Sequence, residues 1–255
     1  MPVPPSLEDA RLPDLYDGDV EGRGGNRVLL RRVDCPVIVL AALLLAQPAC
    51  AAVSDVRGLE ALDGDSIEVV LSDGSKDEVR LLSIDAPEKG QPLADEARAR
   101  LHQAIAGQQL RLITGTRERD RYDRRLAFVE TDGVVVNEHL VEEGLAVVYV
   151  LPPTTERVDD LLAAQARAHA AKRGLWALEG EVEEPRSYRA RNRDSSRQRR
   201  ILRYENWVLT GNRRSRVAHW PGCRHVDAMN PANRVPFTSV EEATALGYRM
   251  ETGYE

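Results

Sequence analysis

Polar and apolar positions alternate in short β-rich runs between Val53 and about Arg80. Alternation with a period of two residues is typical of strands that are buried on one face. The sequence "SDGS" separates two of these runs, and its Asp73-Gly74 pair is a strong hairpin signal. We therefore predict an antiparallel meander of three strands over 53–80.

The periodicity then changes to that of a helix over residues 92–106, and Gly107 ends this pattern. The later predicted elements are a strand over 108–114, a hairpin over 125–137, a short helix over 137–146 and an alanine-rich helix over 155–173. This order predicts an α+β fold, in which a small closed antiparallel five-stranded β-barrel carries about three packed helices. Closure of the barrel removes the exposed sheet edges.

The composition changes beyond Leu178. Residues 179–203 lack apolar periodicity and are rich in charge, so we predict a disordered linker. Its arginines either add nonspecific contacts to phosphates or merely keep a tether soluble. Residues 204–255 contain strand-like and helix-like runs again, and they are expected to form a small C-terminal module.

Residues 28–52 carry two arginines, then an apolar run, then Ala49-Cys50-Ala51. This is the pattern of a secretory signal peptide with cleavage after Ala51, and the apolar run is shorter than the roughly 20 residues that span a bilayer. We expect a secreted or periplasmic protein, with an uncleaved membrane anchor as the alternative. Residues 1–27 are then either disordered or the result of a start codon assigned too early.

Charge and cysteine content restrict the possible binding partners and disulfides. The formal net charge of -6 argues against bulk attraction to nucleic acid, but arginines are concentrated over 186–216 and local fields matter more than the total. Two of the three cysteines lie in the predicted leader, so the mature chain keeps only Cys223 and has no internal disulfide.

Acidic residues and arginines cluster at the ends of the predicted strands, in the order "DGDSIEV", "VRLLSIDAPE", "DRYDRRLAFV" and "DGVVVNEHLVEEGLA", followed by "RGLW". Each of these strings taken singly is weak evidence for a function. Together and in this spacing they resemble the staphylococcal nuclease-like (thermonuclease, micrococcal nuclease) family over about half the chain. The resemblance implies an oligonucleotide-binding fold, which agrees with the predicted order of elements.

The same resemblance implies a role for each charged residue. Asp65 and Asp85 would hold Ca²⁺ together with the backbone oxygen of Ala86, because this ion is hard and accepts irregular oxygen coordination. Glu88 would orient or deprotonate the attacking water. The resemblance also makes Arg80 and Arg124 the groups that bind the scissile phosphate, while Asp63 is expected to be a turn residue more than a direct ligand.

Some positions depart from the family pattern or from regular geometry. Asp123 and Arg125 replace glycines that often flank Arg124, and Asp123 is expected to weaken phosphate binding. Tyr149 is a candidate for contact with the nucleotide, or it belongs to the core. Arg80 and Asp85 are an odd number apart, so a bend between them is required if both face one site.

The C-terminal module resembles small modules that follow such nuclease domains and that are akin to zinc-binding modules of DNA-repair proteins. Those modules combine a histidine and a cysteine, like His219 and Cys223, with a later Cys-x-x-Cys pair. This chain ends "GYRMETGYE" instead, so we expect no stoichiometric zinc, although His225 and Glu251 could substitute.

The sequence therefore favours a calcium-dependent endonuclease that hydrolyses phosphodiester bonds of DNA and RNA with low sequence specificity. We expect a monomer without a stable membrane partner. Two alternatives stay open: a non-catalytic nucleic-acid-binding module on the same barrel, and a cell-surface calcium-binding protein. Retention of all five charged residues of the predicted site argues against the first, and the second leaves both arginines unexplained.

Overall fold

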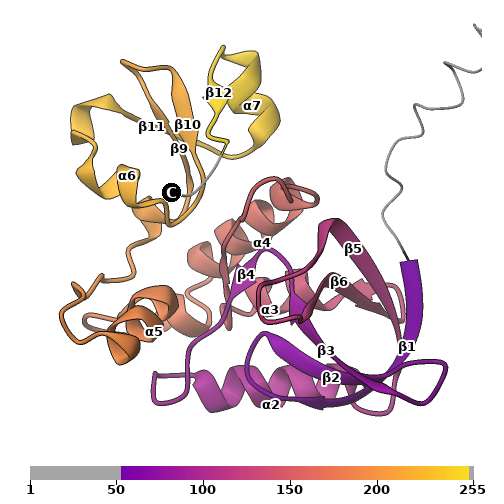
Figure 1. The fold of residues 1–255 in the computed structure, drawn as a ribbon. Coiled ribbons are helices and arrows are strands. Elements are labelled where there is room, and N and C mark those ends of the chain that lie inside the picture. Colours follow the sequence, from indigo (N-terminus) through magenta and orange to yellow (C-terminus); the bar gives the residue numbers. More distant parts are fainter. Residues whose placement is uncertain (1–52, 253–255) are drawn as a thin grey trace, which may run out of the picture. The chain divides into compact units, whose positions relative to one another are not determined.

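The protein is described by a computed structural model that covers residues 53–252. The predictions for 1–27 and 28–52 lie outside these residues, and so do residues 253–255. Within the described part, none of the helices has both the length and the apolar character needed to cross a bilayer. We keep the element labels of Figure 1 throughout.

Five strands close into a barrel. They are β1 (Val53–Ala61), β2 (Ser66–Val70), β3 (Lys76–Leu81), β5 (Gln109–Arg119) and β6 (Arg125–Thr131). The order β3-β2-β1-β5-β6 is closed by pairing of β3 with β6, which confirms the α+β class and the barrel. The closing pair is parallel, so the prediction of an all-antiparallel barrel is wrong at this one seam. The reason is parity, since four antiparallel steps separate β3 from β6 and leave both running in the same direction.

Three helices pack on the barrel, as predicted. They are α2 (Ala94–Ile105), α3 (Val136–Glu142) and α4 (Val158–Ala170). Leu101 and Ile105 of α2 are fully buried, and Figure 1 shows this helix alongside the barrel strands. After α4 a short turn of 3-10 helix (Gly174–Ala177) returns the chain to the core through Leu175. The two-residue β7 (Val134–Val135) completes the predicted hairpin with β6.

A sharp turn at Ser83 redirects the chain between β3 and β4 (Ile84–Asp85). Ser83 has a φ of 60°, in the left-handed region, which confirms the bend that the odd spacing of Arg80 and Asp85 requires. The buried side chain of Asn137 fixes this turn, because it donates to Leu82 O at 2.9 Å and accepts from Val129 N at 3.0 Å. Strand β4 then pairs with β8 (Val147–Val148).

The segment 179–203 contains the helix α5 (Pro185–Arg193), so the prediction of a disordered linker is wrong there. Pro185 occupies the first turn, where its missing N–H costs nothing. Glu183 is buried and pairs with Arg191 at 2.7 Å, while Ser187 donates to the same carboxylate. Ion pairs and a serine hydroxyl, rather than an apolar stripe, therefore hold this helix, which is why hydrophobic periodicity does not reveal it.

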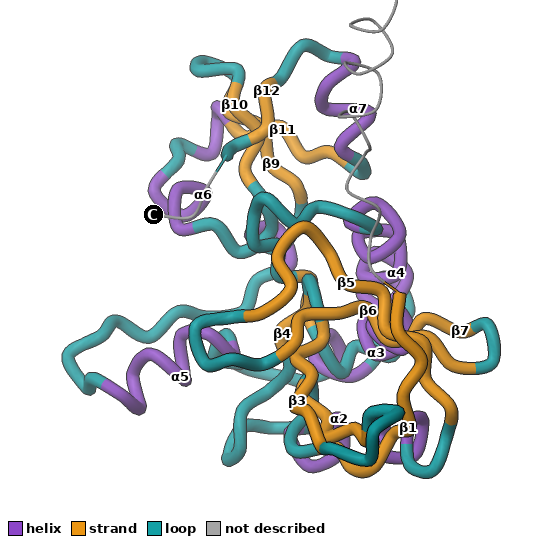
Figure 2. Tube along the Cα trace, turned by 45° about the vertical axis from the view of Figure 1, so that its right-hand side comes forward, coloured by secondary structure: helices purple, strands orange, loops and turns teal. Residues whose placement is uncertain are grey.

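The C-terminal module begins near Trp207 and contains four short strands and two short helices. Its elements are β9 (Leu209–Asn212), β10 (Val217–His219), α6 (Arg224–Ala228), β11 (Arg234–Phe237), α7 (Val240–Ala245) and β12 (Arg249–Met250). Figure 2 shows the strands β9 to β12 gathered with α6 and α7 on either side. Gln165 of α4 ties the module to the barrel, since its side chain accepts from Val148 N and donates to the carbonyl oxygen of the buried Trp207.

Candidate active site

Strand register brings the predicted site residues to one end of the barrel. Ser66 pairs with Arg80 between β2 and β3, and Val79 pairs with Arg125 between β3 and β6. Asp65 immediately precedes β2 and Arg124 immediately precedes β6. These positions, far apart in the sequence, therefore meet around Arg80 near the end of β3.

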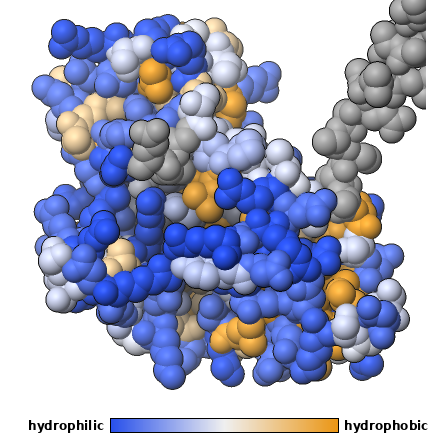
Figure 3. All heavy atoms as spheres, viewed as in Figure 1, coloured by the Kyte–Doolittle hydropathy of each residue, from blue (hydrophilic) through white to orange (hydrophobic). Residues whose placement is uncertain are grey.

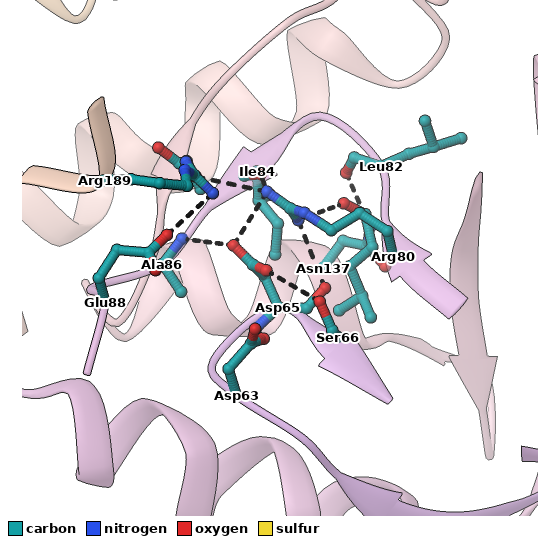
Figure 4. A network of polar contacts seen from close by, with 12 residues as sticks. Asp63, Asp65, Ser66, Arg80, Leu82, Ile84, Ala86, Glu88, Asn137 and Arg189 are labelled. Atoms are coloured by element: carbon teal, nitrogen blue, oxygen red, sulfur yellow. Dashed lines mark hydrogen bonds and ion pairs between the residues drawn. The ribbon is translucent and has the colours of Figure 1, made fainter. Parts of the chain in front are cut away.

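Asp65 is held close to the loop that carries Ala86. Its Oδ2 atom accepts from the backbone N–H of Ala86 at 2.8 Å (Figure 4). Gly64 allows this approach, because a Cβ at that position would lie 2.6 Å from the Cβ of Ala86. Asp63 accepts from the N–H of Asp65 at 2.9 Å, so it shapes the turn, in agreement with its expected role.

Arg80 bridges the two predicted metal-binding carboxylates. Its Nη2 atom lies 2.9 Å from Asp65 Oδ2 and 3.4 Å from Asp85 Oδ1, and the side chain is nearly buried. The guanidinium also donates to the carbonyl oxygens of Leu81 and Ile84. These contacts fix the guanidinium plane before any substrate arrives.

The acidic pair suits a hard cation. Both carboxylates are buried, and Asp85 Oδ2 has no hydrogen-bond partner among the described residues. Burial raises the pKa of Asp65 to about 7, and the Arg80 charge only partly offsets this effect. A buried carboxylate oxygen without a donor is costly unless a cation neutralises it, so the residues present fit a calcium ion.

Arg189 of α5 is a residue of the site that sequence reasoning did not assign to it. Its Nη2 atom lies 2.5 Å from Asp85 Oδ1 and its Nη1 atom lies 2.9 Å from Glu88 Oε1. Burial raises the pKa of Glu88, and the Arg189 charge works against this shift. The sequence contained one signal for such a helix. Arg186, Arg189 and Arg193 follow a proline at a spacing that places all three on one helix face.

Arg124 is oriented by Asp120 and not by its neighbour Asp123. Two guanidinium nitrogens of Arg124 donate to Asp120 Oδ2, at 2.9 and 2.7 Å. Asp123 has a φ of 66°, in the region that glycine adopts most easily, and its exposed carboxylate points to Arg119 at 3.7 Å. The expected conflict between Asp123 and Arg124 is therefore absent from the described structure.

A cavity of about 830 Å³ joins these groups. Its lining includes Asp65, Arg80, Glu88, Arg124, Tyr149 and Arg189. The Tyr149 ring is mostly buried and lies 5.3 Å from the Arg186 guanidinium, an arrangement that fits both a packing role and a contact with substrate. Figure 3 shows a largely hydrophilic face with only scattered hydrophobic groups.

A closed five-stranded barrel with packed helices is an oligonucleotide-binding fold, and buried carboxylates and arginines lie together at one of its ends. The family profile described as "Staphylococcal nuclease homologue" matches residues 78–178. Thermonuclease of Staphylococcus hyicus is 31% identical over 125 residues, which cover 47% of this chain and 73% of that protein. Endonuclease YncB of Bacillus subtilis (strain 168) is 37% identical over 130 residues, 48% of this chain and 61% of that protein.

A further relative, named uncharacterized endonuclease, of Escherichia coli O157:H7, is 38% identical over 128 residues, 49% of this chain and 79% of its own length. This chain belongs to the staphylococcal nuclease-like family. It spans about three fifths of the length of endonuclease YncB.

Proposed function

We propose that this protein is a calcium-dependent endonuclease that hydrolyses phosphodiester bonds of DNA and RNA with low sequence specificity. One observation carries the proposal. Arg80 contacts two buried carboxylates, and it shares a cavity with Asp65 and Arg124. The other carboxylate, Asp85, has an oxygen that lacks a partner among the described residues. A non-catalytic binding barrel has no need for buried carboxylates beside its phosphate-binding groups.

The carboxylates of Asp65 and Asp85, with the backbone oxygen of Ala86, are the groups that would hold calcium. When bound, the ion supplies positive charge next to the phosphate and neutralises the buried acids. Arg80 already contacts both carboxylates. The ion and this guanidinium would therefore act on the same phosphate group.

Arg80 and Arg124 would stabilise the charge that develops on the phosphate. Guanidinium groups suit this task because their planar donors match phosphate oxygens in pairs. Arg80 is fixed by backbone carbonyls and Arg124 by Asp120. Such preorganisation matters because donors that are already aimed at the reacting group need no rearrangement during the reaction.

Glu88 would orient the attacking water and accept its proton. Its side chain is partly exposed, and burial raises its pKa, which brings it closer to that of an effective general base. In the described structure one oxygen of Glu88, Oε1, pairs with Arg189, and the other would serve the water molecule.

Catalysis is tested with the purified protein on single-stranded and double-stranded DNA and on RNA. We expect cleavage with calcium and none with a chelator. Arg124→Ala should lower turnover by roughly 10²-fold because a fixed charge on the transition state is lost. Glu88→Gln should also lower turnover, while binding to nucleic acid, measured by fluorescence polarisation, stays within a few-fold for both variants.

The matched control is Arg125→Ala, since Arg125 neighbours Arg124 in sequence but pairs with Asp77 instead. Its turnover should stay close to that of the unmodified protein. Calcium-independent binding without any cleavage by the unmodified protein would leave the barrel as a binding module and reject the nuclease.

For localisation, we propose a secreted or periplasmic protein whose leader is removed after Ala51. The sequence pattern of residues 28–52 supports this proposal. Intact-mass measurement of the protein recovered from the exporting cell tests it. A mature mass that includes residues 28–51 would instead favour an anchored form.

A further inference from the structure

Four side chains with metal-ligating atoms meet in the C-terminal module. They are His219, Cys223, His225 and Glu251, and one ligand atom from each lies within 4.8 Å of all the others. The sequence offers only one thiol in this module, and on that ground no zinc is expected, because one cysteine alone cannot form a sulfur site. The structure instead gathers two imidazoles, a thiol and a carboxylate, all of which bind zinc in proteins.

The distances within the cluster approach those of a tetrahedral site, and all four ligand atoms lie within 4.8 Å of one another. Cys223 Sγ lies 3.8 Å from His219 Nδ1, 3.6 Å from His225 Nδ1 and 3.2 Å from Glu251 Oε2. Glu251 carboxylate oxygens lie 3.0 Å from His219 Nδ1 and 2.9 Å from His225 Nδ1. Tetrahedral ligands about 2.0–2.3 Å from zinc are about 3.3–3.8 Å from one another, so only small movements are needed to accept the ion.

The backbone holds the first pair of ligands in place through a tight turn. His219 ends β10, and Cys223 N donates to Trp220 O at 3.1 Å, which closes the turn between the two ligands. Gly222 in this turn has a φ of 71°, and a Cβ there would lie 3.0 Å from the Trp207 ring. The turn therefore cannot relax easily, and His219 and Cys223 stay aimed at one point.

Glu251 is positioned by strand pairing at the other side of the cluster. Strand β12 pairs with β10, and Glu251 N donates to Ala218 O at 2.9 Å. The carbonyl oxygen of Glu251 accepts from Trp220 Nε1, also at 2.9 Å. Two backbone anchors thus place this carboxylate, although it lies 28 residues after Cys223 in the sequence.

We infer that the C-terminal module binds one zinc ion through His219, Cys223, His225 and Glu251. Four protein ligands leave no open position, so the ion is structural rather than catalytic. Three of the ligands are largely buried, whereas the His225 side chain is half exposed at one side of the site. A module of about 50 residues is also of the size that commonly depends on a metal or a disulfide for stability.

The test uses the full chain with Cys35 and Cys50 replaced by serine, so that Cys223 is its only thiol. The protein is stripped of metal, loaded with zinc and passed through a gel-filtration column before elemental analysis. We expect about one zinc per chain. Cobalt added to the stripped protein should produce a thiolate-to-metal charge-transfer band, which one equivalent of zinc removes.

Variants connect the metal to these residues. Cys223→Ser should abolish the charge-transfer band, and His225→Gln should weaken zinc binding by at least about tenfold. Because His225 is half exposed, its variant should keep the fold even if the cysteine variant does not. His139→Gln changes a histidine outside the cluster and should leave the charge-transfer band and the zinc affinity unchanged.

Asp85→Asn tests whether the metal binds instead at the acidic site of the barrel. A metal at that site would have no thiolate ligand, so this variant should leave the charge-transfer band intact. The inference is overturned if the zinc-loaded protein carries less than about 0.1 zinc per chain. A charge-transfer band that persists in Cys223→Ser, or zinc affinity that is unchanged in His225→Gln, would overturn it as well. None of these readouts depends on nuclease activity.

Discussion

Arg189 occupies the acidic site in a way that should oppose calcium, and its removal should strengthen calcium binding. The guanidinium donates to Asp85 and pairs with Glu88, at 2.5 and 2.9 Å. A cation that binds Asp85 is repelled by this neighbouring positive charge unless the Arg189 side chain withdraws. We therefore predict that Arg189→Ala binds calcium more tightly than the unmodified protein when no nucleic acid is present.

The size of the effect follows from the two contacts. A hydrogen bond to a charged group contributes about 1.5–3 kcal/mol, and the lower end applies because the Arg189 side chain is 28% exposed and therefore partly screened by solvent. If opening both contacts costs about 1.5–3 kcal/mol in total, the competent state is reduced roughly 10- to 100-fold. The apparent dissociation constant for calcium rises by the same factor.

Calorimetric titration with calcium at low salt measures this constant for both proteins. Arg193→Ala is the matched control, since Arg193 lies one turn further along α5 and lines the same cavity. It should change calcium affinity by less than about threefold. Unchanged or weaker calcium binding by Arg189→Ala would refute the competition.

Three more outcomes are expected. Calcium affinity should fall by up to about tenfold per pH unit below about 7, because burial raises the pKa of Asp65 to about 7 and calcium binds only its ionised form; affinity that is constant between pH 5 and 7 would contradict this. Arg186→Ala should reduce the slope of log affinity against log salt by about one, measured by polarisation with DNA, if this arginine of the cavity contacts a phosphate; an unchanged slope would leave it as a packing residue beside Tyr149. Asn137→Ala should lower the free energy of unfolding by about 2–4 kcal/mol in urea, because two buried hydrogen bonds are lost; a loss below about 0.5 kcal/mol would be evidence against this anchor.

The barrel was predictable from local patterns, whereas the acidic site was predictable only through the resemblance to the nuclease family. Turn signals and alternating runs set the strands, and the register of β2, β3 and β6 then carries Asp65, Arg80 and Arg124 to one end. The parity of Arg80 and Asp85 requires a bend only if both face one site, and the turn at Ser83 meets that condition.

The role of α5 in the acidic site could not be predicted, because it depends on contacts between residues that are distant in the sequence. Arg189 reaches Asp85 across 104 positions, and the segment that carries it has a composition typical of disorder. The ion pairs that support α5 become visible only when both partners are placed in space. The C-terminal cluster is an intermediate case, since the sequence offers His225 and Glu251 as possible substitutes for the missing thiols but only the structure brings them to His219 and Cys223.

Gln165 affects the choice of a minimal fragment for protein engineering. Its amide links Val148 of β8 to Trp207, and β8 pairs with the strand that carries Asp85. A fragment cut at residue 178, where the family match ends, would lose Trp207 and leave a buried amide donor unsatisfied, at a cost of about 1–3 kcal/mol. Homology and folding thus set different boundaries in this chain, and a shortened fragment should keep residues up to Trp207 unless the contact with Gln165 has been given a substitute.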